Sequence, residues 1–172
     1  MLLGLVMVVT LVAYQQDTVT HKDSLPAPVP PAAPTIEQIR YMAGLKTATR
    51  GVAQIRDGVN RVVRTQQADS LTRRRAARRL GGLCGTARSF IVSGRPKMQA
   101  TAYADTMRVL AKQLTTRLDS LTSALPVCEK TAGKDANAVA TNLTTRLKNY
   151  DDALLAFRTA LKPDSTKTVT QQ

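Results

Sequence analysis

The sequence predicts an all-α protein, a small helical bundle of three to four amphipathic helices with coiled-coil-like packing. Apolar residues recur every three to four positions from Thr35 onward, and capping residues or helix breakers stand at the ends of these segments. Aromatic residues are scarce, with four Tyr, two Phe and no Trp in 172 residues. A core built from Leu, Val, Ile and Ala suits closely packed helices, and the length is right for one such domain.

An apolar run and a proline-rich stretch precede the predicted bundle. Residues 1–14 carry no charge. As a helix they would reach only about 21 Å, which is short of the roughly 30 Å core of a bilayer. We therefore expect an apolar leader or membrane anchor, and favour one that is retained. Residues 15–34 are expected to be an extended linker, because five prolines between Leu25 and Pro34 fix φ and remove backbone donors.

These two segments suggest where the protein resides. We expect the bacterial cell envelope, with the protein anchored to or associated with a membrane on its periplasmic side. A cytoplasmic location is the alternative, because the bases Lys22, Arg40 and Lys46 follow the apolar run and the positive-inside bias keeps such a flank in the cytoplasm.

The bundle domain is expected over residues 35–162, and its first helix should begin with a capping box formed by Thr35 and Gln38. Its apolar seam alternates spacings of three and four: Leu45, Ala48, Val52, Ile55, Val59 and Val62. Three glycines follow one edge of the seam: Gly44, Gly51 and Gly58. Since helical glycines cost about 1 kcal/mol each, they indicate a second helix packed unusually close. That helix belongs either to the same bundle or to another chain, for which the glycines would form a helix-docking stripe.

An arginine cluster follows, defined by five residues: Arg73, Arg74, Arg75, Arg78 and Arg79. Because Gly81-Gly82 comes next, we expect a helix to end near Leu80, starting either at Thr35 or at a second cap, Asp69 or Ser70. Cations in the last turns of a helix complement its dipole. Five arginines exceed that need, so the alternative interpretation is a patch for phosphate or carboxylate groups. Residues 36–97 carry 14 bases and 3 acids, which makes this half the basic part of a chain of net charge +13.

Two further helices are predicted. The third segment should run to Leu125 and stop at Pro126, with an apolar side made of Tyr103, Met107, Leu110, Leu114, Leu118, Leu121 and Leu125. Asp135 is the expected N-cap of the fourth, whose seam is Ala140, Leu143, Leu147, Tyr150, Leu154, Phe157 and Leu161. Lys162-Pro163 should end it. Residues 163–172 are expected to be a disordered tail.

The two cysteines, Cys84 and Cys128, are candidate disulfide partners in an oxidising compartment. A straight hairpin of segments 70–92 and 97–125 would separate them by about 30 Å along the bundle, at 1.5 Å per residue. A bridge therefore requires the helix to stop near Leu80 and the chain to travel back along the bundle before Tyr103. The alternative is a pair of unbonded thiols.

The sequence predicts no catalytic residues, no cofactor and no metal site. His21, the only histidine, falls in the linker, and the cysteines lack the spacing of a metal or haem site. We therefore expect no enzyme.

Two functions fit this absence of reactive groups. The first is a membrane-tethered scaffold or accessory subunit of a larger membrane complex. Its partners would be other protein chains, integral membrane subunits above all, and its contact with the membrane would be made by residues 1–14. The alternative is a polyanion-binding protein that uses the arginine cluster on anionic lipid headgroups, lipopolysaccharide or nucleic acid. Nucleic acid is the least expected partner, because the chain has no helix-turn-helix signature and no aromatic stacking platform.

Overall fold

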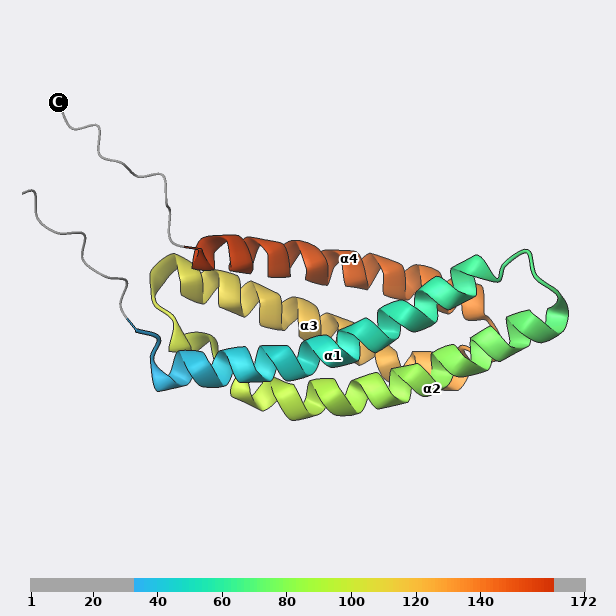
Figure 1. Cartoon of the computed structure of the whole chain (residues 1–172), viewed down its shortest axis with the longest axis horizontal. Coiled ribbons are helices and arrows are strands. Elements are labelled where there is room, and N and C mark those ends of the chain that lie inside the picture. The colour runs from blue at the N-terminus through green and yellow to red at the C-terminus, as the bar shows by residue number, and fades with distance from the viewer. Residues whose placement is uncertain (1–32, 163–172) are drawn as a thin grey trace, which may run out of the picture. The chain divides into compact units, whose positions relative to one another are not determined.

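Four helices run alternately up and down along one axis (Figure 1): α1 (Ile36–Arg64), α2 (Ser70–Gly94), α3 (Asp105–Thr131) and α4 (Ala136–Leu161). The computed structural model describes residues 33–162, and no strand occurs in this part of the chain. The predicted all-α bundle is confirmed. The apolar run 1–14, nearly all of the linker 15–34 and the tail 163–172 lie outside the described residues.

Each helix packs against two neighbours, in the order α1, α2, α3, α4 and back to α1. The contact between α1 and α2 is the most extensive, and the contact between α1 and α4 is the least extensive of the four. The predicted seams form the core, since every α1 seam residue from Leu45 to Val62 is buried and so is every α4 seam residue from Ala140 to Phe157. In α4 the exception is Leu161, with 38% of its surface exposed, because α4 ends there. In the predicted seam of α3, Met107 and Leu110 are only partly buried.

Side-chain caps fix the starts of three helices. Thr35 Oγ1 accepts from the Gln38 backbone N at 3.2 Å, and Gln38 Oε1 accepts from the Thr35 backbone N at 3.0 Å, which confirms the capping box. Asp69 Oδ1 accepts from two backbone N–H groups at the start of α2. At the start of α4, Asp135 Oδ1 accepts from the backbone N of Ala138. The first two helices are therefore separate, and the interpretation with a second cap at Asp69 is the correct one.

The expected helix end near Leu80 is wrong, because α2 continues through the glycines to Gly94. Beyond Leu80, the buried residues Cys84, Ala87 and Ile91 keep the spacing of four, three and four that a helix needs to bury one face. That burial offsets a glycine cost of about 1 kcal/mol per position. An apolar period that continues past a glycine pair is thus a stronger signal than the pair itself.

Pro126 does not stop α3 either, and the helix extends to Thr131. Proline removes one backbone donor and crowds the preceding turn, at a cost of about 3 kcal/mol. The residues after it are nevertheless held in place, since Cys128 and Ala132 are 1% and 0% exposed and Cys128 is cross-linked to α2. Their packing keeps the last turn helical.

The connection between α2 and α3 is long. It contains two 3₁₀ turns, Arg95–Lys97 and Ala100–Ala102, and buries Met98 and Tyr103. Figure 1 shows α3 beginning well beyond the end of α2 along the bundle axis. This offset changes which residues of the two helices lie side by side, and the disulfide depends on it.

Candidate functional site

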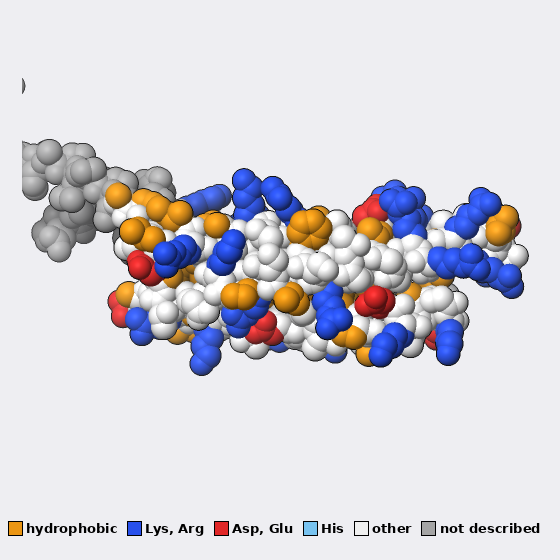
Figure 2. Space-filling model, turned by 90° about the horizontal axis from the view of Figure 1, so that it is seen from below, with side chains coloured by type: hydrophobic (Ala, Val, Ile, Leu, Met, Phe, Trp, Pro, Cys, Tyr) orange, Lys and Arg blue, Asp and Glu red, His pale blue; other side chains and the backbone are white. Residues whose placement is uncertain are grey.

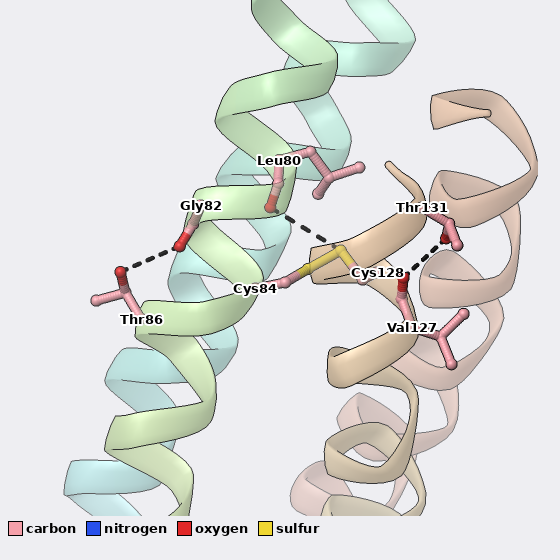
Figure 3. Close-up of a disulfide and its surroundings, with 7 residues drawn as sticks. All are labelled: Leu80, Gly82, Cys84, Thr86, Val127, Cys128 and Thr131. Atoms are coloured by element: carbon pink, nitrogen blue, oxygen red, sulfur yellow. Dashed lines mark hydrogen bonds between the residues drawn. A yellow bond between two sulfur atoms is a disulfide. The ribbon is translucent and has the colours of Figure 1, made fainter. Parts of the chain in front are cut away.

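The two cysteines form a disulfide between α2 and α3, with 6.2 Å between their Cα atoms (Figure 3). Cys84 lies ten residues before the end of α2, and Cys128 lies 23 residues after the start of α3. At 1.5 Å per residue these positions differ by about 20 Å, so the two cysteines can lie at the same level only because α3 begins beyond the end of α2 along the axis. The predicted disulfide is confirmed. The route predicted for it, with a helix that ends near Leu80, is wrong, because α2 continues to Gly94.

The disulfide is part of the core. Both cysteines are almost fully buried, and Cys128 Sγ lies 3.9 Å from the backbone oxygen of Leu80 (Figure 3). An oxidised sulfur carries no proton, so this is a packing contact and not a hydrogen bond. Gly81 lets the two helices approach here, since a Cβ at this position would lie 3.3 Å from the Glu129 backbone oxygen. The bridge thus has a structural role.

The glycine stripe faces α2 of the same chain. A Cβ at Gly44 would lie 2.6 Å from the backbone oxygen of Gly94, and a Cβ at Gly51 would lie 2.6 Å from that of Ala87. At Gly58 it would lie 2.8 Å from Leu80 Cδ1. The close second helix was correctly predicted. The alternative interpretation, in which these glycines dock a helix of another chain, is wrong because α2 of the same chain covers all three positions.

All five side chains of the arginine cluster are exposed. They lie in the first three turns of α2, at the end of the bundle where α1 is joined to α2. Figure 2 shows basic side chains gathered at this end, on the right of the view. The interpretation of the cluster as a helix C-terminus is therefore wrong, since these turns lie toward the positive end of the α2 dipole.

The arginine cluster has no ionic partner in the part of the chain that the structure describes. The four ion pairs there, Arg56–Asp151, Arg61–Asp57, Arg95–Asp119 and Lys148–Asp152, use other residues. The nearest acid in sequence, Asp69, is used as the cap of α2 and also accepts from Thr72 Oγ1 at 2.6 Å. The Thr72 hydrogen bonds are the main cause that lowers the pKa of Asp69. No carboxylate of residues 33–162 therefore competes with an external anion for these guanidinium groups.

A cleft of about 210 Å³ opens beside the cluster. It lies between the end of α1, the start of α2 and the α3–α4 connection, and three of its lining residues are cations: Arg73, Arg74 and Lys134. Thr65, Gln66 and Asn137 add hydrogen-bonding groups. The one acid in the lining is Asp135, whose Oδ1 already accepts from the Ala138 backbone N. Lys134 was not predicted as a site residue, because only the fold brings it beside α2.

Arginine is well suited to binding oxyanions at such a cleft. Its planar guanidinium presents N–H donors in a fork that matches phosphate and carboxylate groups bidentately. Arg75, Arg78 and Arg79 are exposed on α2 outside the cleft, so the site has one recessed anion position and several exposed ones. This arrangement fits an extended polymer or a surface with repeated negative charges better than a single small anion.

Other hollows on the bundle differ in chemistry. A groove of about 450 Å³ between α3 and α4 contains one cation, Arg146, which donates to Ser120 and Asn142 and so is satisfied internally. Residues 33–162 contain no group of three His, Cys, Asp or Glu side chains placed to hold a metal ion. None of the four described helices combines the length and the apolar character needed to cross a bilayer.

Replacing Arg78 and Arg79 by Gln is expected to raise the free energy of unfolding by roughly 0.5 kcal/mol. Arg78 follows Arg74 by four positions, and Arg79 follows Arg75 by the same spacing. An i,i+4 pair of like charges destabilises a helix by about 0.2–0.5 kcal/mol. Urea denaturation at low salt measures the change, which should shrink as salt screens the charges. Arg88→Gln is the control, because this exposed arginine has no charged residue three or four positions away. A less stable double variant would contradict the prediction.

Comparison with protein-family models, with curated proteins and with solved structures finds no match to this chain.

Proposed function

We propose that this chain is a non-catalytic binding protein that attaches to a phosphate-bearing polyanion through the arginine-rich end of its bundle. The observation that carries the proposal is that five exposed arginines have no carboxylate partner among the described residues. Two of them, Arg73 and Arg74, line a cleft together with a sixth cation, Lys134.

The energetics of the cluster support this proposal. Two pairs of like charges stand one turn apart near the start of α2, where they gain nothing from the helix dipole and oppose folding slightly. A purely structural surface would be more stable without them. A polyanion reverses the sign of this effect, since each guanidinium then gains an oxyanion partner and releases a counterion from the polymer.

The chemistry of the ligand class follows from the donors. Phosphate groups spaced along a polymer or a glycolipid can each take a guanidinium fork, while the cleft accommodates one group more deeply. Lipopolysaccharide, anionic phospholipid and nucleic acid share this chemistry. They differ in how the phosphates are presented, so the experiment must compare all three.

Changing all five cluster arginines to Gln is expected to lower polyanion affinity by at least about a hundredfold at low salt. Each lost phosphate contact removes one counterion-release contribution to binding, which for duplex DNA is about 0.9 in the slope of log affinity against log salt. Fluorescence anisotropy with labelled lipopolysaccharide, labelled duplex DNA and phosphatidylglycerol vesicles measures the change. The preferred source is the one that binds the unchanged protein most tightly at physiological salt.

The matched control removes five exposed cations elsewhere on the bundle: Arg40, Arg88, Lys112, Arg117 and Lys162. Changed to Gln, they lower the net charge by the same amount, and we expect them to weaken binding far less than the cluster does. Equal losses in both variants would mean that binding reflects net charge alone, and that the arginine-rich end is not a site.

The role as a scaffold or accessory subunit of a membrane complex stays a prediction. Residues 1–14, which would make the membrane contact, lie outside the described residues. The periplasmic location, the protein partners and the absence of catalysis are likewise predictions from the sequence. A polyanion-binding bundle is compatible with such a tether, because the arginine cluster lies at the end of the bundle opposite to Ile36, where α1 begins.

A further inference from the structure

A second open surface lies between α1 and α4, toward the other end of the bundle. It is a groove of about 670 Å³, and all but one of its lining residues come from α1. Its apolar residues are Met42, Ala43, Leu45 and Ala53. Leu45 belongs to the core and forms the floor, whereas the other three are exposed. From Met42 to Ala53 the groove follows α1 for about 16 Å.

The groove continues toward the start of α1. Ile39 is 56% exposed and precedes Ala43 by one turn, so it lies on the same face of the helix. Ile36, which is 65% exposed, lies one turn earlier. Isolated exposed apolar side chains need no explanation, but here they extend an apolar strip that is already recessed between two helices.

The polar groups of the groove are nearly all cations. Lys46 and Arg50 come from α1, and Arg158 comes from α4 on the opposite side. Within residues 33–162 no ion pair is formed by any of the three. Thr49, the remaining polar residue, donates to the Leu45 backbone oxygen at 2.8 Å and pairs with the Tyr150 hydroxyl at 3.2 Å. Among the described residues, no carboxylate therefore neutralises the positive charge of the groove.

An ion pair joins α1 and α4 beyond one end of the groove. Beyond Ala53 the ion pair between Arg56 and Asp151 joins α1 to α4, with a shortest N–O distance of 2.6 Å. Toward the start of α1, no described residue covers the apolar strip. A ligand that fits this groove has an elongated apolar part, because a charged group would be unfavourable against the apolar floor. It also has a negative group, which the three cations of the groove can bind.

We propose that the α1–α4 groove binds the single acyl chain of an anionic amphiphile, such as a long-chain fatty acid. The chain lies along Met42 and Ala43 and extends toward Ile39. The headgroup is held by Lys46, Arg50 and Arg158, which line the groove next to this apolar strip. This site is separate from the arginine-rich end and does not depend on polyanion binding there.

The test uses the full chain and a dansyl-labelled fatty acid, whose fluorescence rises in an apolar site, with unlabelled palmitate as competitor. Ala43→Phe combined with Ala53→Phe fills the groove, and we expect at least about a tenfold loss of affinity, equivalent to the lost burial of about two methylene groups. The control adds the same two aromatic rings at exposed positions on α2 and α3, as Val92→Phe with Val109→Phe. It should bind as the unchanged protein does.

A second variant tests the headgroup. Changing Lys46, Arg50 and Arg158 to Gln should weaken palmitate binding about tenfold and leave competition by hexadecanol, its uncharged counterpart, unchanged. All of these positions are exposed, and circular dichroism checks that each variant keeps its helices.

The same measurements can overturn the proposal. Residues 1–14 are present in every variant, so any adsorption through them is the same in all. If the groove-filling variant binds the probe as tightly as the control, the apolar strip adsorbs lipid on its surface and is not a binding groove. Absence of saturable binding to the unchanged protein would also refute the proposal.

Discussion

Reduction of the Cys84–Cys128 disulfide is expected to lower the free energy of unfolding by roughly 4 kcal/mol. The bridge closes a loop with a sequence separation of 44, and closing a loop of this length removes that much entropy from the unfolded chain at room temperature. The loss is large compared with a total stability of about 5–15 kcal/mol for a domain. The disulfide also ties α2 to α3, at the point where Pro126 weakens α3.

Urea denaturation followed by circular dichroism, with and without a reducing agent, measures this difference. The control is a variant with both cysteines changed to Ala, whose stability should not respond to the reductant. Reduction is the cleaner comparison, because it leaves the buried sulfur atoms in place, whereas the two Ala side chains leave a cavity. A change below about 1 kcal/mol would mean that packing alone determines how α2 and α3 are aligned.

Most of the fold could be predicted from the sequence, because the buried residues repeat at helical spacing. The seams of α1 and α4 are the clearest examples, and the caps at Thr35, Asp69 and Asp135 mark helix starts by a mechanism that acts within four residues. Local features of this kind are readable without knowing the tertiary structure.

The errors arose where a local breaker opposed a long-range contact. Gly81-Gly82 and Pro126 are typical of helix ends, but here the tertiary packing of Cys84, Ala87 and Cys128 outweighs the local cost. The sequence did contain the opposing signal, since the apolar period continues unchanged past both breakers. It could not show how far α3 is offset from α2, because a connection of ten residues can cover any distance up to about 33 Å.

The candidate site was predicted only in part. Five arginines in seven residues are visible in any reading of the sequence, but whether they end or begin a helix depends on the boundary at Leu80. The cleft beside them could not be predicted, since it requires Lys134 from the α3–α4 connection to lie beside Arg73 and Arg74. The α1–α4 groove is similarly invisible, because Arg158 joins it only through the order of helices in the bundle.

The glycines of α1 and α2 lead to the second large prediction. Changing Gly44 to Ala is expected to lower the free energy of unfolding by about 2–3 kcal/mol, although alanine favours the helix by about 1 kcal/mol. The new Cβ would lie 2.6 Å from the backbone oxygen of Gly94 and 2.8 Å from Lys97 Cβ. A backbone atom cannot rotate away, so α1 and α2 must separate. Gly94→Ala should have a similar effect, since its Cβ would lie 2.5 Å from the Gly44 backbone oxygen.

The matched control is Gly82→Ala in the middle of α2. A Cβ there would have no atom within 4 Å, so only the gain in helix propensity remains, and we expect stability to rise by about 1 kcal/mol. Changing glycine to alanine is thus expected to lower the free energy of unfolding at Gly44 in α1 and to raise it at Gly82 in α2, although both positions are helical. Urea denaturation of the oxidised proteins measures both. If Gly44→Ala were stabilising as well, α1 and α2 could not be in close contact along the glycines, and the stripe would again be open to a helix of another chain.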